Sequence, residues 1–245
     1  RQFVGREHEI AQLTDLAPIT TIDGTAGIGK TSLAMYCAHR VEHQFPDGQL
    51  HVNLRGFDAR EPMEPGQALH GFLQALGVAP AGIPAGLEDK AALFRSQLAD
   101  QRLLIVLDNA RTAEQVRPLL PGSPTCAVII TSRNRLDSLT VREGARRVAL
   151  DGLSYQEATA LLAERMGAER IAAEPEAVTA LLDLCARLPL ALSIAAARAA
   201  SQPDLTVSGL VAQLRDQRGR LDVLDLGDDD LSLRAVFSWS YNVLS

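Results

Sequence analysis

Short apolar runs alternate with amphipathic segments along the first 150 residues of the chain. The apolar runs, several of them rich in β-branched residues, predict strands at 19–23, 49–54, 103–107, 127–131 and 147–150. Apolar residues at helical spacing predict helices at 6–16, 30–43, 67–76, 88–98 and 112–119. Strands and helices that alternate in this way favour an α/β fold built on a parallel sheet with right-handed crossovers.

The pattern changes after residue 150, where amphipathic segments follow one another with no strand between them. They predict helices at 155–166, 176–187, 190–200 and 207–214. Asp151 and Gly152 mark the expected hinge, and a polar stretch at 216–230 precedes a last predicted helix at 231–244. We therefore expect an α/β domain over 1–151, a helical domain over 152–216, and a linker with one further helix over 217–245.

Composition and charge narrow the class of protein. Hydrophobic residues make up 47% and aromatic residues only 4%, which favours a core of Ala, Leu, Val and Ile. The net charge of -6 argues against a broad nucleic-acid-binding surface, so any contact with DNA is expected from a domain outside this segment. The start of the chain does not resemble a signal peptide, and no apolar run reaches membrane-spanning length.

The three cysteines, Cys37, Cys126 and Cys185, lie far apart without metal-ligand spacing. They are expected to be buried free thiols, which indicates a reducing, cytoplasmic location. No initiator methionine is present and the last predicted helix is cut off, so we expect a piece of a larger protein.

The segment from Gly24 to Thr31 matches the phosphate-binding pattern G-x-x-x-x-G-K-[ST] at every required position. Glycine allows a loop to wrap a pyrophosphate with its own N–H groups, and the next helix turns its N-terminus toward the same anion. Lys30 is expected to reach the β- and γ-phosphates, and the Thr31 hydroxyl to bind magnesium. The expected nucleotide-binding residues of this segment are Thr25, Ala26, Gly27, Ile28, Gly29, Lys30, Thr31 and Ser32.

A magnesium site on this loop needs a carboxylate at the end of a neighbouring buried strand. Asp108 follows the apolar run 103–107 and is the candidate, although the same residue could instead cap a following helix. Arg133 follows the run 127–131 and could meet the γ-phosphate, although it could equally be a surface residue in a polar turn.

Four short motifs, one of them the end of this loop, follow one another in a recognisable order along the chain. They are Phe3-Val4-Gly5-Arg6-Glu7, the Gly-Ile-Gly-Lys-Thr end of the loop, Arg187-Leu188-Pro189-Leu190-Ala191, and Phe237-Ser238-Trp239-Ser240-Tyr241. In this order they resemble the NB-ARC group of STAND ATPases, the signalling switches of apoptosis adaptors and plant resistance proteins. The wording of each motif is most similar to the ATPase core of AfsR-like bacterial transcriptional regulators of the SARP class.

The resemblance implies a P-loop NTPase sheet flanked by helices, a small all-helical domain and the truncated start of a winged-helix domain. It also implies that the loop strand lies inside the sheet and that the strand of Asp108 is not its neighbour in sequence. Val4, Gly5 and Arg6 would line the adenine end, and Pro189 would pack on the adenosine. Asp108 would be the Walker B carboxylate and Arg133 the sensor of the γ-phosphate.

Two positions depart from the pattern of the family. Asn109 stands where many members carry a second acidic residue, and an amide can orient a water but cannot take its proton. Slow hydrolysis is therefore expected, with Lys30, Asp108, Asn109 and Arg133 as the catalytic group. Arg187 stands where the family usually has Gly, which leaves the approach of Pro189 to a nucleotide open.

The sequence thus predicts an ATP- and ADP-binding signalling ATPase module that depends on magnesium. Such a module would act as a conformational switch, with self-association among the possible outcomes. One alternative is a small-molecule kinase, whose lid arginines could only be Arg142, Arg146 and Arg147; a solvated face explains these three better. Another alternative is a binding module that holds ADP permanently and never hydrolyses ATP.

Overall fold

The computed structural model describes residues 4–202 and 204–215, which fall into two compact units. The first, here called the sheet unit, comprises Glu7–Gly24 and Lys30–Leu150. The second, the helical unit, comprises the described residues of Arg1–Arg6, Thr25–Gly29 and Asp151–Ser245. The three expected domain limits stay a prediction. The predicted helix at 231–244 and the start of a winged-helix domain lie outside the described residues.

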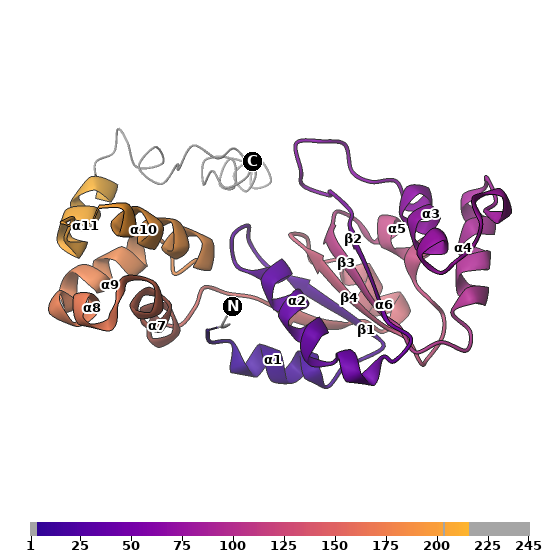
Figure 1. Ribbon diagram of the computed structural model, residues 1–245, viewed down its shortest axis with the longest axis horizontal. Coiled ribbons are helices and arrows are strands. Elements are labelled where there is room, and N and C mark those ends of the chain that lie inside the picture. Colours follow the sequence, from indigo (N-terminus) through magenta and orange to yellow (C-terminus); the bar gives the residue numbers. More distant parts are fainter. Residues whose placement is uncertain (1–3, 203, 216–245) are drawn as a thin grey trace. The chain divides into compact units, whose positions relative to one another are not determined.

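The sheet unit is built on five parallel strands in the order β2-β3-β4-β1-β5 (Figure 1). This order confirms the predicted parallel sheet. It also places the loop strand β1 inside the sheet, between β4 and β5, as the resemblance implied, and β4 separates β1 from β3. The strands are β1 (Ile19–Asp23), β2 (Gln49–Asn53), β3 (Leu104–Ala110), β4 (Ala127–Ser132) and β5 (Arg146–Ala149).

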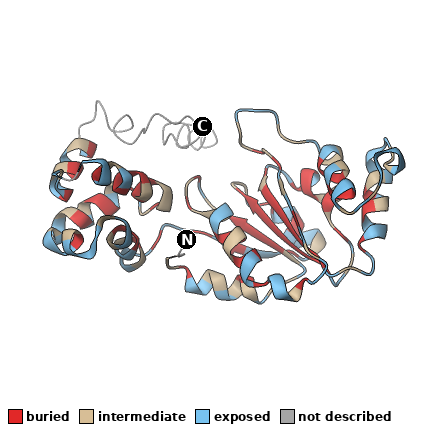
Figure 2. Cartoon of the chain, viewed as in Figure 1, coloured by how far each residue is buried: buried red, intermediate tan, exposed pale blue. Residues whose placement is uncertain are grey.

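Strands β3 and β4 are buried almost throughout, as Figure 2 shows by their red colour. Alternating residues such as Ile105, Leu107, Val128 and Ile130 join one apolar cluster with helices α3 and α4. Helix α2 packs against β1, β3 and β4. The register of β3 on β4 shifts between Leu107 and Ala110, so the end of β3 carries a bulge around Asp108.

The helices of the sheet unit largely match the predicted ones. The exception is α6, because its seven residues bury a single apolar side chain, Leu139, and so show no helical period. In the predicted segment 112–119 an α-helical turn continues into a 3₁₀ turn. The helices are α1 (Glu7–Thr14), α2 (Lys30–Arg40), α3 (Pro65–Ala75), α4 (Leu87–Gln97), α5 (Ala113–Val116) and α6 (Asp137–Glu143).

The core of the chain has the predicted aliphatic character. Phe72 of α3 and Phe94 of α4 are a stacked aromatic pair, with ring centroids 5.6 Å apart, inside a cluster of Leu, Ile, Val and Ala. The three cysteines are buried thiols outside any disulfide, as expected. Burial raises the pKa of the Cys37 thiol to about 11, and Arg40 only partly offsets this, so the buried thiol stays protonated at neutral pH.

The helical unit contains five helices after residue 150 among the described residues. They are α7 (Tyr155–Met166), α8 (Ala168–Ala173), α9 (Pro175–Leu184), α10 (Pro189–Ser201) and α11 (Val207–Arg215). The prediction missed α8, a six-residue helix with one buried residue, Ile171. A capping box formed by Ser154 and Glu157 sets the start of α7.

The predicted helix at 176–187 is three residues too long. Helix α9 ends at Leu184 because Ala186 and Arg187 both adopt a left-handed backbone conformation, with φ of 50° and 54°. The N–H of Arg187 then donates to the carbonyl of Leu182, a bond that satisfies an otherwise unpaired helix-end carbonyl. A left-handed conformation strains any residue that has a Cβ, so this sharp helix end lowers the stability of the folded protein.

This strain predicts that Ala186→Gly stabilises the protein. Ala186 is exposed, and glycine adopts its conformation without the steric penalty, so the free energy of unfolding should rise by about 1 kcal/mol. Urea unfolding followed by circular dichroism measures the change. Ala160→Gly, at an exposed position inside α7, is the matched control and should lower the same quantity by about 1 kcal/mol. Equal destabilisation by both substitutions would contradict the prediction.

Candidate nucleotide-binding site

The glycine-rich segment connects β1 to α2, the strand–loop–helix context that phosphate binding requires. Gly27 and Gly29 have φ of 74° and 95°, values that residues with a Cβ rarely adopt. Gly24 and Lys30 belong to the sheet unit, whereas residues 25–29 belong to the helical unit. The two parts of the segment therefore have different surroundings.

Lys30 is the first residue of α2 and is half-buried. Its ammonium group donates to the carbonyl of Gly24 at 2.8 Å. Burial lowers the pKa of Lys30 to about 8; the positive charge of Arg133 lowers it further, while Asp108 and Asp23 act in the opposite direction. Lys30 and Arg133 thus place two positive charges at one end of the sheet, where an anion would relieve their repulsion.

Asp108 and Thr31, the two predicted metal ligands, lie in direct contact. The Thr31 hydroxyl donates to Oδ1 of Asp108 at 2.7 Å, and the Thr131 hydroxyl of β4 donates to the same oxygen at 2.5 Å. Asp108 is only 6% exposed. The alternative role of Asp108 as a helix cap is wrong, because Asp108 lies within β3 and Thr112 caps the following helix α5.

The donor atoms of this pair fit a magnesium ion. A hydroxyl and a carboxylate are hard oxygen ligands, and magnesium usually takes only one or two side chains while phosphates and waters complete its octahedron. Residues 4–202 and 204–215 contain no cluster of three His, Cys, Asp or Glu side chains that could hold a metal by itself. A metal at Thr31 and Asp108 would therefore depend on the nucleotide for the rest of its shell.

Asn109 and Arg133 lie at the same end of the sheet. The N–H of Asn109 donates to the Thr131 hydroxyl at 2.9 Å, and its side-chain amide donates to Asp58 at 2.8 Å. The guanidinium of Arg133 stacks on the ring of Phe57, 5.0 Å from the centroid. Burial lowers the pKa of Arg133, and the charge of Asp58 opposes this effect. Phe57 and Asp58 were not predicted, because the loop that carries them shows no motif.

Asp23 and Arg147 form an ion pair that the sequence analysis did not predict, in which the carboxylate is buried and the Arg147 side chain stays 32% exposed. Both nitrogens of the Arg147 fork bind the carboxylate, at 2.6 and 2.7 Å, and Asp23 is 6% exposed. Arg147 was interpreted as part of a solvated face; the residue is exposed, and the parallel register of β1 and β5 also brings its guanidinium to Asp23. This pair fixes the residue that directly precedes Gly24.

In the helical unit, Gly5 and Arg6 hold the start of α7. The N–H of Arg6 donates to Glu157 at 2.5 Å, and Gly5 has φ of 76°. A Cβ at Gly5 would lie 2.6 Å from the Glu157 carboxylate, so the contact requires glycine. The buried guanidinium of Arg6 donates to the carbonyls of Ile28 and Asp151, at 3.1 and 2.8 Å. Val4, the third predicted residue here, is half-buried.

The start of α10 also contacts residues 25–29. The N–H of Leu190 donates to the carbonyl of Gly27 at 3.2 Å, and the ring of Pro189 lies 3.9 Å from the position that a Cβ on Gly29 would occupy. The side chain of Arg187, which replaces the usual glycine, stacks on Tyr155 of α7 at 4.8 Å from the ring centroid. Arg187 therefore packs on α7, and its presence still leaves Pro189 beside the loop.

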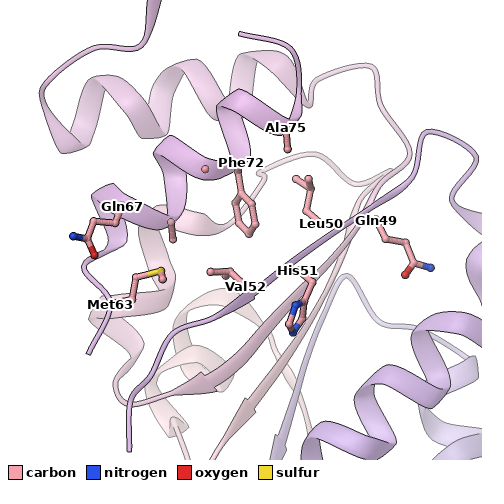
Figure 3. Close-up of a pocket in the computed structure, with 10 residues that line it drawn as sticks. Gln49, Leu50, His51, Val52, Met63, Gln67, Phe72 and Ala75 are labelled. Atoms are coloured by element: carbon pink, nitrogen blue, oxygen red, sulfur yellow. The ribbon is translucent and has the colours of Figure 1, made fainter. Parts of the chain in front are cut away.

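A separate hollow of about 370 Å³ lies between the edge strand β2 and helix α3. Figure 3 shows Leu50, Val52, Met63 and Phe72 turned toward it, with His51 on the other side of the strand. Its lining contains no Lys, Arg, Asp or Glu, so it does not suit a phosphate group. The candidate site is the glycine-rich segment and its neighbours.

Comparison with solved structures identifies the class of protein to which the fold belongs. The chain matches a signal transduction ATPase with numerous domains (STAND) from Pyrococcus horikoshii with a TM-score of 0.56 and 28% identity, over 78% of this chain and 29% of that one. It also matches Cdc6p from Pyrobaculum aerophilum with a TM-score of 0.60 and 17% identity, over 84% and 65% of the two chains. The fold is that of the P-loop NTPases.

The relatives found by sequence point to a narrower group of proteins. The regulatory protein AfsR of Streptomyces griseus is 47% identical over 226 residues, which is 92% of this chain and 23% of that protein. AfsR of Streptomyces coelicolor is 44% identical over 255 aligned positions, 99% of this chain and 25% of that protein. The chain is thus homologous to one segment of AfsR regulators and spans about a quarter of their length. No protein-family model matches it.

Among the residues described, none of the helices combines the length and the apolarity needed to span a lipid bilayer.

The Glu157 contacts predict a pH dependence of stability. Burial alone would raise the pKa of Glu157, but hydrogen bonds from Arg6 and Ser154 together lower it below its ordinary 4.5. The stabilisation is therefore present above about pH 4.5 and is lost as pH falls through the lowered folded value. Glu157→Gln should destabilise the protein at pH 7, and the difference in urea midpoint should shrink toward pH 4. Glu164→Gln, exposed on the same helix, should show no such trend.

Proposed function

We propose that this chain is the nucleotide-binding switch module of a larger regulator, binding ATP or ADP with magnesium and hydrolysing ATP slowly. The observation that carries the proposal is the contact between Thr31 of the glycine-rich segment and Asp108 at the end of β3. It joins a hydroxyl and a carboxylate from two separate motifs into the oxygen pair that a nucleotide-bound magnesium requires.

Each charged group then has a role set by chemistry. Lys30 neutralises the β- and γ-phosphates, and its lowered pKa fits a cation awaiting an anion. Arg133 would bind the γ-phosphate, for which its planar fork is suited. When bound, magnesium would neutralise phosphate charge, with Thr31 and Asp108 as its protein ligands.

A nucleotide also needs contacts at its adenosine end. Resemblance assigns these to Val4, Gly5, Arg6 and Pro189, and the bonds of Arg6 and Leu190 to the loop carbonyls support a role in holding the loop. We propose that Arg6 acts mainly on the loop, since its guanidinium already donates to Ile28 and Asp151. Pro189 is the better candidate for packing on the sugar or base.

The switch requires more than one sensor. A charge-assisted hydrogen bond from Arg133 to the γ-phosphate is worth about 1.5–3 kcal/mol. Moving a population from 1:99 to 99:1 takes about 5.5 kcal/mol. The magnesium shell or another domain of the longer protein must therefore contribute. Self-association, contact with DNA through other domains and a cytoplasmic location belong to this proposal.

A specific observation weakens the kinase alternative. A kinase would need arginines available to an acceptor or lid, yet Arg147 is committed to a bidentate pair with Asp23. The relatives in sequence are regulators. A permanently ADP-bound module is still an alternative, and nucleotide exchange distinguishes it from a switch.

The first test is nucleotide binding and turnover. The chain should bind ADP and ATP in titrations with magnesium and release phosphate more slowly than about 10 s⁻¹, the median for enzymes. Lys30→Ala should weaken ATP binding by at least about tenfold through loss of a charge-assisted bond. The chain has one other lysine, Lys90 on α4, and Lys90→Ala is the matched control with unchanged affinity. No binding, or faster turnover, would contradict the proposal.

The second test isolates the γ-phosphate. Arg133→Ala should weaken binding of a non-hydrolysable ATP analogue by about 10- to 150-fold, equivalent to 1.5–3 kcal/mol, and leave ADP affinity nearly unchanged. Isothermal titration calorimetry gives both constants. Arg135→Ala, at a 65% exposed side chain two residues away, serves as the control. An equal loss for both nucleotides would show that Arg133 does not distinguish them.

A further inference from the structure

The loop that follows β2 is fastened to the end of β3 by backbone bonds. The N–H of Leu54 donates to the carbonyl of Asp108 at 2.8 Å, and the N–H of Gly56 donates to that of Asn109 at 2.7 Å. A Cβ on Gly56 would lie 2.5 Å from the Asn109 oxygen, so only glycine allows this approach. These bonds therefore hold the loop in one position relative to Asp108 and Asn109 of β3.

The base of the same loop is closed by a buried amide. Gln115 of α5 donates from its side chain to the carbonyls of Leu54 and Met63, at 3.0 and 2.9 Å. The N–H of Met63 donates to the carbonyl of Leu54 at 2.9 Å. Loops held at both ends in this way keep the side chains they carry in place. Phe57 and Asp58 are carried between these anchors.

Asn109 has an unusual backbone for a strand residue. Its φ is 58°, a left-handed value that asparagine tolerates better than most residues, and it lies in the bulge of β3. Its amide nitrogen donates to Oδ1 of Asp58 at 2.8 Å. An ionised carboxylate only accepts hydrogen bonds, so it selects the amide NH₂ group and leaves the amide oxygen directed elsewhere.

Asp58 also acts on Arg133. The negative charge of Asp58 favours the charged form of the Arg133 guanidinium, which stacks on the neighbouring Phe57. Two adjacent loop residues thus contact two side chains at the carboxyl ends of β3 and β4. Asp58 orients the Asn109 amide by a hydrogen bond, and Phe57 stacks on the Arg133 guanidinium.

We propose that Asp58 is a positioning residue for ATP hydrolysis, fixing the Asn109 amide so that its oxygen can orient the attacking water. The loop after β2 thereby supplies the negative charge that the position after Asp108 lacks. This inference rests on the proposed function, since it requires ATP to bind at residues 24–31.

The chemistry balances without a protein base. The oxygen of water bonds to the γ-phosphorus, and the bond from phosphorus to the β,γ-bridging oxygen breaks with its electron pair left on ADP. One proton of the water passes to an oxygen of the released phosphate, because the Asn109 amide cannot accept it. Asp58 contributes orientation alone, which accords with slow hydrolysis.

The test is a double-mutant cycle measured by single-turnover hydrolysis on the whole chain. Asp58→Ala and Asn109→Ala should each lower the rate, by up to about 100-fold for a misplaced group. The double variant should be no slower than the slower single variant, because Asp58 acts through Asn109. Affinity for ADP with magnesium and the unfolding temperature should change little.

Two further variants sharpen the result. Asp58→Asn keeps an acceptor but no longer selects one orientation of the Asn109 amide, so its hydrolysis should fall less than that of Asp58→Ala. Should Asp58→Ala fail to fold, Asp58→Asn alone carries the test, and unchanged hydrolysis in it overturns the proposal. Asp47→Ala is the control. It removes a carboxylate that accepts a hydrogen bond from the N–H of Arg102 at 2.6 Å, at the amino ends of β2 and β3, far from Asp58 along the strands. This substitution should leave hydrolysis unchanged.

The outcomes distinguish failure of the positioning role of Asp58 from failure of the proposed nucleotide binding. Independent, multiplicative losses in the cycle, or a loss of ADP affinity equal to the loss of rate, would overturn the positioning role of Asp58. Nucleotide binding by the wild-type chain without measurable hydrolysis would also overturn it and leave nucleotide binding intact. Absence of nucleotide binding by the wild-type chain would instead refute the proposed function.

Discussion

The buried carboxylate of Asp108 is the constraint on which the arrangement of the sheet unit depends. A carboxylate withdrawn from water is stable only with hydrogen-bond partners. Here Thr31 and Thr131 supply two hydroxyls, and each comes from a different neighbouring element. Strand β4 must lie beside β3 for Thr131 to reach Asp108, and the observed strand order meets this need. The Thr131 hydroxyl also accepts from the backbone N–H of Asn109, so one hydroxyl links the Asp108 carboxylate to the next residue of the strand.

The glycine-rich segment is supported by different interactions along its length. Its ends belong to the sheet unit, where Lys30 bonds to Gly24 and Asp23 is held by Arg147. Its middle belongs to the helical unit, where Arg6 and Leu190 donate to backbone carbonyls. A phosphate loop needs its N–H groups for the ligand, so support through its carbonyls leaves the binding groups available. Residues far from the loop in sequence, Arg6 and Leu190, therefore contact its backbone without occupying its N–H groups.

Local pattern predicted the regular elements well where they are long or fully buried. All five strands and the longer helices lie within a few residues of the predicted ranges, because burial imposes a period that the sequence must carry. Helices α6 and α8 were missed because each buries one side chain. The end of α9 was misplaced because two residues with a Cβ adopt a conformation that sequence statistics assign to glycine. The pair of Arg147 with Asp23 was not predicted because an ion pair across strands leaves no local signal.

Local sequence patterns were enough to establish the class of the molecule: a strand, a glycine-rich loop with Lys30 and Thr31, a second strand that carries Asp108 near its end, and an aliphatic α/β pattern. These features are local, since each depends on residues within about one element. Which side chains meet depends instead on tertiary packing. The pairing of Asp58 with Asn109, separated by 51 positions, and of Asp23 with Arg147, separated by 124, follows from strand order and register. Such contacts depend on how distant segments pack, and a linear pattern carries no record of them.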